Sequence, residues 1–229
     1  MDYNFDKDGL EIIPYLDLKD YLTLKLYAVT WLQKLFKQYG IELNEDTLKQ
    51  YHLNDLASTQ IHSEILKATN RHCIPPSHIL ELLHNKSLKN FLDKIKVTKY
   101  TVWNEGYGSL AFRLIRPNRG DGYPYSCKDW GPAKGIISVW IPILGFNKTQ
   151  ILSLVPGSHL KTYASHLPVD GIHMKNEYRL SEPLSLELTD RPVLKRGEAI
   201  VFHSKTIHSE EVIEGDETRL NLEFRLLPQ

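Results

Sequence analysis

Three short stretches in the second half of the chain carry side chains that bind metal ions and anions. The first is Cys127-Lys128-Asp129, the second ends in His208, and the third is Glu217-Thr218-Arg219, which opens the last predicted strand. Residues two apart in an extended strand point the same way, so the side chains at 127 and 129 can converge on one ion. A distant histidine on another strand completes three ligands on one side of a metal, which is the facial arrangement of non-haem Fe(II) oxygenases. An arginine on a neighbouring strand can then hold the carboxylate of a co-substrate through paired hydrogen bonds.

The elements that must position these residues differ on the two sides of residue 96. Before it, apolar residues recur at helical spacing. We predict helices over 18–39 and 55–69, a third that begins after Pro75-Pro76 with Ser77 as its N-cap, and a short fourth over 87–95. After residue 96, apolar runs shorten to strand length between turn sequences. We predict strands at 97–103, 110–116, 136–143, 151–155, 184–188, 199–203 and 220–226, with 210–213 as a further candidate.

Residues 157–182 show no strand pattern, and we expect an irregular loop there. Loops of that length usually cover or select a ligand, and His159 and His173 lie in it. Helices followed by seven or eight short strands indicate an α+β fold, with a helical layer on a β-sandwich or barrel. We therefore expect one domain over 1–229, in which residues 1–95 are mainly helical support and 96–229 form the β core.

Composition narrows the classes of function. The 229 residues include 28 Lys+Arg and 28 Asp+Glu, and this balance disfavours a nucleic-acid partner. The longest apolar run, residues 136–144, is shorter than the roughly 20 residues of a membrane span. Two cysteines cannot build a disulfide framework, and the acidic start lacks the pattern of a signal peptide. We expect a soluble, cytoplasmic protein that acts on a small molecule, with no membrane or nucleic-acid partner and an undetermined oligomeric state.

Several pieces of the second half resemble a known family when they are taken in order. They are AFRLIRP, SCKDWGPAKGIISVWIPI, LVPGSH, RGEAIVFHSKTIH and ETRLNLEFRL, and they resemble the phytanoyl-CoA dioxygenase-type family of Fe(II)/2-oxoglutarate-dependent oxygenases. The resemblance covers residues 85–227 and is greatest to bacterial members from carbohydrate-biosynthesis clusters. It implies a double-stranded β-helix (a jelly-roll, cupin-like fold) behind an N-terminal helical layer. It also implies decarboxylation of 2-oxoglutarate to succinate coupled to hydroxylation of a small metabolite, with a sugar or sugar-derived molecule as the expected class.

The resemblance assigns roles residue by residue. Asp129 falls on the carboxylate ligand of Fe(II) and His208 on the distal histidine ligand. Arg219, eleven residues after His208, falls on the arginine that binds 2-oxoglutarate. Trp140 falls on an aromatic residue that lines the cofactor region. The expected catalytic residues are therefore Asp129, His208 and Arg219.

Two departures from the family pattern affect this site. The family's first ligand is a histidine two residues before the aspartate, where this chain has Cys127. A cysteine there either binds the metal as a thiolate or is a small buried residue that binds nothing. Two residues after the distal histidine, the family has a small polar side chain and this chain has Glu210, which would repel 2-oxoglutarate or pair with Arg219 and block the pocket. The alternatives are a catalytically inactive jelly-roll ligand-binding protein and, third, a cupin-like metal hydrolase or isomerase.

The last predicted strand leaves its surroundings open. Polar side chains at 219, 221, 223 and 225 share one of its faces. Such a face is either half-exposed to water or lines a polar pocket. If it is exposed, Arg219 and His208 form a cross-strand pair on the surface. We also expect His203, which ends the preceding predicted strand, to line the pocket.

Overall fold

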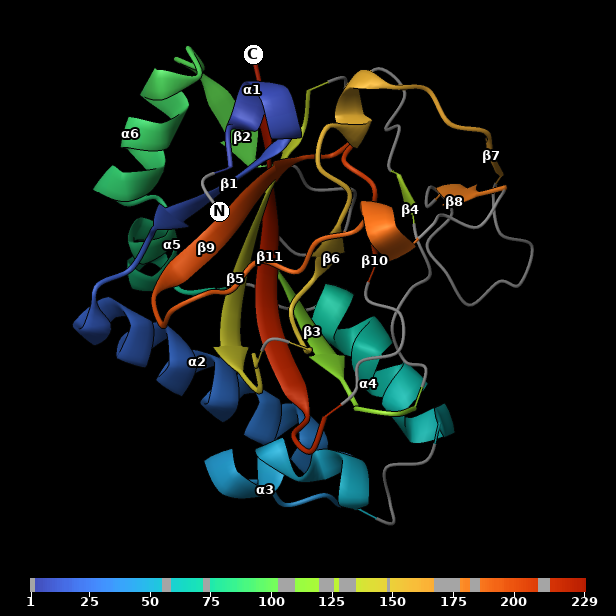
Figure 1. The fold of residues 1–229 in the computed structure, drawn as a ribbon. Coiled ribbons are helices and arrows are strands. Elements are labelled where there is room, and N and C mark those ends of the chain that lie inside the picture. The colour runs from blue at the N-terminus through green and yellow to red at the C-terminus, as the bar shows by residue number, and fades with distance from the viewer. Residues whose placement is uncertain are drawn as a thin grey trace.

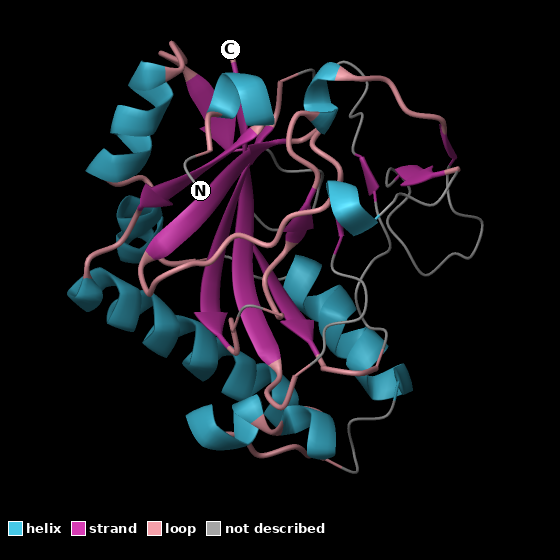
Figure 2. Cartoon of the chain, in the orientation of Figure 1, coloured by secondary structure: helices cyan, strands magenta, loops and turns pink. Residues whose placement is uncertain are grey.

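The computed structural model of the chain describes residues 3–54, 59–71, 75–102, 110–119, 126–127, 135–147, 149–166, 178–181, 186–209 and 215–229. Within these ranges, helices pack against one side of a large antiparallel sheet, and very short strands lie on its other side (Figures 1 and 2).

The predicted helices are present in the described residues. They are α2 (Leu18–Lys37), α4 (Thr59–Arg71), α5 (Ser77–Leu83) and α6 (Lys86–Lys94). The predicted cap of α5 is wrong, because Pro76 is its N-cap, without a side-chain hydrogen bond, and Ser77 is already helical. The pattern also missed three elements of five residues or fewer, which are too short to show a periodic stripe. These are α1 (Phe5–Asp8), α3 (Glu45–Lys49) and the 3-10 helix η1 (Tyr51–Leu53).

Helix α2 packs against the large sheet. Its N-cap is Asp17, whose carboxylate accepts a hydrogen bond from the backbone N–H of Asp20. Its buried side chains recur every three to four residues, so they form one stripe against the sheet. The hydroxyl of Tyr21 donates to the carbonyl of Ile143 at 2.6 Å, and burial raises the pKa of Tyr21 to about 12. This hydrogen bond fixes the helix to the central strands.

The large sheet has six antiparallel strands in the order β1-β9-β5-β11-β2, with β3 also paired to β11. Their bounds are Leu10–Pro14 (β1), Tyr100–Val102 (β2), Ala111–Ile115 (β3), Ile137–Leu144 (β5), Glu198–His203 (β9) and Arg219–Pro228 (β11). Five of these coincide with predicted strands, but β1 lies in the half predicted to be helical. Every residue of β5 is buried, because helices cover one face of the strand and the second layer covers the other.

The second sheet consists of strands of two or three residues, in the order β6-β10-β4-β8-β7. Their bounds are Ser126–Cys127 (β4), Ser153–Leu154 (β6), Ser165–His166 (β7), Tyr178–Leu180 (β8) and His208–Ser209 (β10). The region 157–182 is therefore not wholly irregular, since it contains β7, β8 and the 3-10 helix η2 (Ser158–Leu160). The strand predicted at 184–188 is wrong for residues 186–188, which form a 3-10 helix, η3 (Leu186–Leu188). The strand predicted at 210–213 lies outside the described residues.

Two groups of buried side chains fill the spaces on either side of the large sheet. One joins the helices to the outer face of the sheet. The other occupies the inner face, where Leu10, Trp140, Ile200 and Phe202 pack against residues in and around β6. None of the helices in the described ranges is long and apolar enough to cross a membrane.

Candidate active site

The inner face of β11 is buried. Arg219 and Asn221 have no solvent-accessible surface, and the side chains of Glu223 and Arg225 are each only 12% exposed. The alternation Arg219, Asn221, Glu223, Arg225 therefore lines the interior between the two layers. Of the two readings left open by the sequence, a solvated surface does not describe this face, because its polar side chains are buried.

Arg219 is held by its neighbours on this face. Its Nη1 donates to the carbonyl of Gln150 at 3.1 Å, and its Cζ lies 5.5 Å from the centre of the Trp140 ring. A guanidinium at this distance from an indole face is attracted to the ring. The side chain of Gln150 is in turn tied to the chain, because its Nε2 donates to the carbonyl of Glu217. Trp140 thus lies beside Arg219, and its role in lining a cofactor region stays a prediction.

Several buried polar atoms next to Arg219 have no hydrogen-bond partner among the described residues. Among the described residues, neither amide atom of Asn221 has a hydrogen-bond partner, nor does the indole Nε1 of Trp140, and all of them are buried. A buried polar group without a partner costs about 1–3 kcal/mol, so such groups in a folded protein often mark a ligand site. Asn221 was not among the predicted site residues. The signal that could have found it is its place two residues after Arg219, on the same face.

A second charged group lies further along the same face. Arg225 donates from Nε and Nη2 to Oε1 of Glu223, at 3.0 and 2.8 Å. The Nε of Arg113, on β3, lies 3.8 Å from the other carboxylate oxygen of Glu223. The interior therefore offers charged and amide groups along its length, which suits a polar ligand.

His208 belongs to β10, where it pairs with Leu154 of β6 on one side and Ser126 of β4 on the other. Its ring centre is 5.1 Å from that of Phe202, an inner-face residue of β9. Its Nδ1 and the carbonyl oxygen of Thr206 are 2.7 Å apart. A carbonyl only accepts, so Nδ1 carries the proton and Nε2 of the neutral ring keeps the lone pair that a metal needs.

His208 and Arg219 are connected through the inner-face aromatic residues. The ring of His208 contacts Phe202, Phe202 belongs to the same buried group as Trp140, and Arg219 lies over the Trp140 ring. The structure thus brings both residues to the interior between the layers.

The other predicted metal ligands are placed only in part. Cys127 is the second residue of β4 and pairs with Tyr178 of β8. On its other side β4 pairs with β10, the strand that carries His208. The residue directly across from His208 is Ser126, one position before Cys127. Asp129 and Glu210 lie outside the described residues. Within the described ranges, no three His, Cys, Asp or Glu side chains lie close enough together to hold a metal ion.

Two of the histidines expected near the pocket contact one another instead. The ring centres of His203 and His159 are 5.7 Å apart, and Nδ1 of His203 accepts a hydrogen bond from the backbone N–H of Lys205. Burial, with His159 and Lys205 nearby, lowers the pKa of His203 to about 4. His203 follows the inner-face residue Phe202, so alternation places it on the opposite face of β9. The expectation that His203 lines the pocket stays a prediction, and His173 lies outside the described residues.

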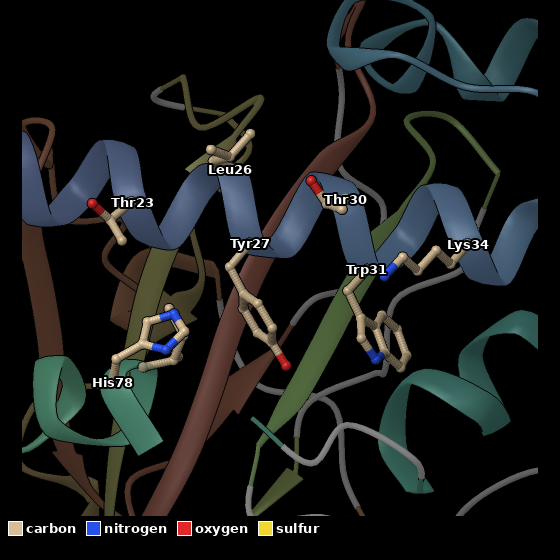
Figure 3. Close-up of a pocket in the computed structure, with 8 residues that line it drawn as sticks. Thr23, Leu26, Tyr27, Thr30, Trp31, Lys34 and His78 are labelled. Atoms are coloured by element: carbon tan, nitrogen blue, oxygen red, sulfur yellow. The ribbon is translucent and has the colours of Figure 1, made fainter. Parts of the chain in front are cut away.

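A separate crevice of about 270 Å³ lies between α2 and the start of α5 (Figure 3). In Figure 3 the rings of Tyr27 and Trp31 point from α2 toward the strands behind, and they contact Phe112 with ring centres 6.2 and 5.4 Å apart. Phe112 belongs to the buried group on the helix side of the large sheet. The crevice is thus on the other face of the sheet from Arg219 and contributes nothing to that site.

Comparison with solved structures relates this fold to non-haem iron proteins. The non-heme monooxygenase ThoJ aligns with a TM-score of 0.60 at 12% identity, over 98% of this chain and 75% of that one. EvdO2 from Micromonospora carbonacea var. aurantiaca, complexed with 2-oxoglutarate, aligns with a TM-score of 0.59 at 14% identity, over 98% of this chain and 88% of that one. The epimerase SnoN, in complex with Fe3+, alpha ketoglutarate and nogalamycin RO, gives 0.56 at 12% identity, over 98% and 80% of the two chains.

No protein-family model and no curated protein sequence matches the chain. At identities of 12–14%, the similarity to these structures concerns the fold. The chain therefore shares its α+β architecture with structures of non-haem iron and 2-oxoglutarate proteins, and the residues of the site must carry any conclusion about chemistry.

Proposed function

We propose that the protein is a jelly-roll Fe(II)/2-oxoglutarate-dependent dioxygenase of the phytanoyl-CoA dioxygenase type that hydroxylates a small metabolite. The observation that carries this proposal is the buried group of Arg219, Asn221 and Trp140, in which a cation adjoins polar atoms without partners among the described residues. A dicarboxylate such as 2-oxoglutarate supplies the acceptors that these donors need.

Each of the three residues has its own part in holding 2-oxoglutarate. The guanidinium of Arg219 takes the distal carboxylate through paired, charge-assisted hydrogen bonds, which are strong in a buried site. The amide of Asn221 donates a further hydrogen bond from the same face. The indole of Trp140 covers the guanidinium, keeps water away from it and supplies its N–H.

His208 is the best-placed ligand for iron. Its Nδ1–H is held by the carbonyl of Thr206, so Nε2 is the atom that binds metal, as is usual for histidine ligands oriented by a backbone carbonyl. Asp129 supplies the carboxylate ligand in this proposal, and Cys127 occupies the position of the third. Iron held by these residues would supply the activation of O2 that is coupled to the oxidative decarboxylation of 2-oxoglutarate.

The substrate class in this proposal is a sugar or sugar-derived molecule. It is supported by the resemblance to bacterial carbohydrate-cluster proteins and by the polar interior. Arg113, Glu223 and Arg225 present charged hydrogen-bonding groups there, which suit a hydroxyl-rich molecule better than an apolar one.

The second candidate is a ligand-binding protein that retained the fold without the chemistry. The presence of Cys127 at the position of the third ligand favours this candidate. A thiolate there adds negative charge to that of Asp129 and of the dianionic co-substrate, and a thiolate is itself oxidisable. This candidate keeps the pocket around Arg219 and lacks bound iron.

An anaerobic titration with Fe(II) and 2-oxoglutarate, followed by a succinate assay in air, tests the proposal. An oxygenase develops the weak visible charge-transfer absorption of the iron chelate and then forms succinate. We expect Arg219→Lys to weaken 2-oxoglutarate binding about 10- to 100-fold, because it loses the paired hydrogen bonds while keeping the charge. Arg196→Lys is the matched control, since Arg196 is exposed and lies over Tyr21 on another part of the surface.

The variants Cys127→His and Cys127→Ala separate the two candidates. If the wild type shows neither absorption nor succinate and Cys127→His gains both, the protein is a binding module that lost its iron. Activity in the wild type that Cys127→Ala abolishes assigns the thiolate as a ligand, whereas activity retained in Cys127→Ala makes it a filler residue. If Arg219→Lys binds 2-oxoglutarate as tightly as the wild type, the proposed co-substrate site is wrong.

A further inference from the structure

The turn between β9 and β10 brings a buried hydroxyl and a metal-binding candidate together. Thr206 has no exposed surface, and its Oγ1 donates to the carbonyl of Gly9 at 2.9 Å. Its backbone N–H donates to the carbonyl of His203 at 2.8 Å. Its own carbonyl accepts from Nδ1 of His208 at 2.7 Å. Thr206 therefore connects the start of the chain to the imidazole of His208.

Ser158, in the LVPGSH sequence, anchors the next residue of the same turn. Its Oγ accepts from the backbone N–H of Ile207 at 2.8 Å and donates to the carbonyl of Val155 at 2.6 Å. The backbone N–H of Val155 donates in turn to the carbonyl of Ile207 at 2.9 Å. Ser158 is 1% exposed, so these bonds are shielded from water.

The contact with Gly9 needs that residue to be glycine. Gly9 has φ of 74°, and a Cβ there would lie less than 3.0 Å from Thr206 Oγ1 and from the ring of His159. The N-terminal segment thus approaches the turn more closely than any residue with a side chain allows.

From these contacts we infer that Thr206 and Ser158 are positioning residues for His208, an inference that rests on the proposed function, in which His208 binds the metal. The partner of a histidine ligand's second N–H fixes the tautomer and the direction of the ring. Here that partner is a backbone carbonyl, so its position depends on what holds the backbone on both sides. The hydroxyl of Thr206 holds it from one side, and that of Ser158 holds it from the other.

Metal affinity, measured apart from catalysis, tests this inference. Co(II) is titrated into the full chain without 2-oxoglutarate, with visible absorption as the readout and temperatures kept well below the melting point. We expect Thr206→Val, which keeps the shape and removes the hydroxyl, to weaken Co(II) binding about tenfold, at the lower end of effects for groups that orient ligands. Its Co(II) spectrum should change as well, because the ligand ring is no longer fixed. Thr206→Ser, which restores the hydroxyl, should recover the wild-type affinity to within about twofold.

Thr69→Val is the matched control. Thr69 is also fully buried, and its Oγ1 also donates to a backbone carbonyl, that of Leu66 at 2.9 Å, but it lies in α4. It should lose thermal stability and keep both the wild-type Co(II) affinity and spectrum. If Thr206→Val does not fold, Ser158→Ala decides the same question, with the same expected direction.

The outcomes separate this inference from the proposed function. If the wild type binds no Co(II), or if His208→Ala binds it as the wild type does, the proposed metal site fails. If the wild type binds Co(II) through His208 and both Thr206→Val and Ser158→Ala match its affinity and spectrum, the positioning role is overturned and the metal site stands. A loss of affinity in Thr69→Val equal to that in Thr206→Val also overturns it, because general destabilisation then explains both.

Discussion

His203 makes the stability of the fold depend on pH in a defined direction. Its ring takes up a proton near pH 6.5 in the unfolded chain but, since burial together with His159 and Lys205 lowers its pKa, only near pH 4 in the folded protein. Between these values the unfolded state binds more protons. The contribution of His203 to the free energy of unfolding is therefore fully present above about pH 6.5, and it is lost as the pH drops toward 4.

The size of the effect follows from the two pKa values. A difference of about 2.5 units corresponds to about 3 kcal/mol once the ring is charged in both states, and to about 2 kcal/mol between pH 7 and pH 5. The ring is only partly buried, and solvent screening reduces the second figure to about 1–2 kcal/mol.

The perturbation is His203→Asn, which removes the titration and leaves an oxygen able to accept the hydrogen bond from Lys205. Urea unfolding of both proteins at pH 7 and pH 5 measures the effect. We expect the wild type to lose about 1–2 kcal/mol more than the variant between these pH values, with similar free energies of unfolding at pH 7. Equal losses in the two proteins would refute the assignment of this pH dependence to His203.

Three further substitutions test other contacts. Asn221→Leu removes a buried amide without a partner among the described residues. We expect the free energy of unfolding without ligand to rise by about 1 kcal/mol, which calorimetry measures. We also expect the dissociation constant for 2-oxoglutarate to increase about fivefold or more, which ligand titration measures. Tyr21→Phe should cost about 1 kcal/mol in urea unfolding, because the carbonyl of Ile143 loses a buried donor. Gly197→Ala should cost about 2 kcal/mol or more in the same assay, because Gly197 has φ of 86° and a Cβ there would run into the carbonyl of Leu16.

The sequence predicted the elements that carry their own pattern. The long strands β5 and β11 and the helix α2 each have enough apolar residues in one register to be recognised alone. The two-residue strands β4 and β10 have no such pattern, since pairing with each other and with their neighbours defines them. Strand β1 was missed for the same reason, because its partner is β9, at the far end of the sequence.

The candidate site divides in a similar way. Arg219 and His208 were selected by type and order, and the structure places both toward the interior. Thr206 could not be selected, because its role depends on a carbonyl 197 positions away in the sequence. The burial of Asn221 likewise depends on how the two layers close over β11, which the alternation of that strand alone does not reveal.

The position of β1 constrains how the chain assembles during synthesis. Leu10 emerges from the ribosome early, and its partner Phe202 emerges 192 residues later. The edge of the large sheet therefore stays unpaired through most of translation, and contacts of such long range slow folding. A nascent chain halted before residue 202 should present β1 as an open strand to chaperones, because no later segment is yet available to pair with it.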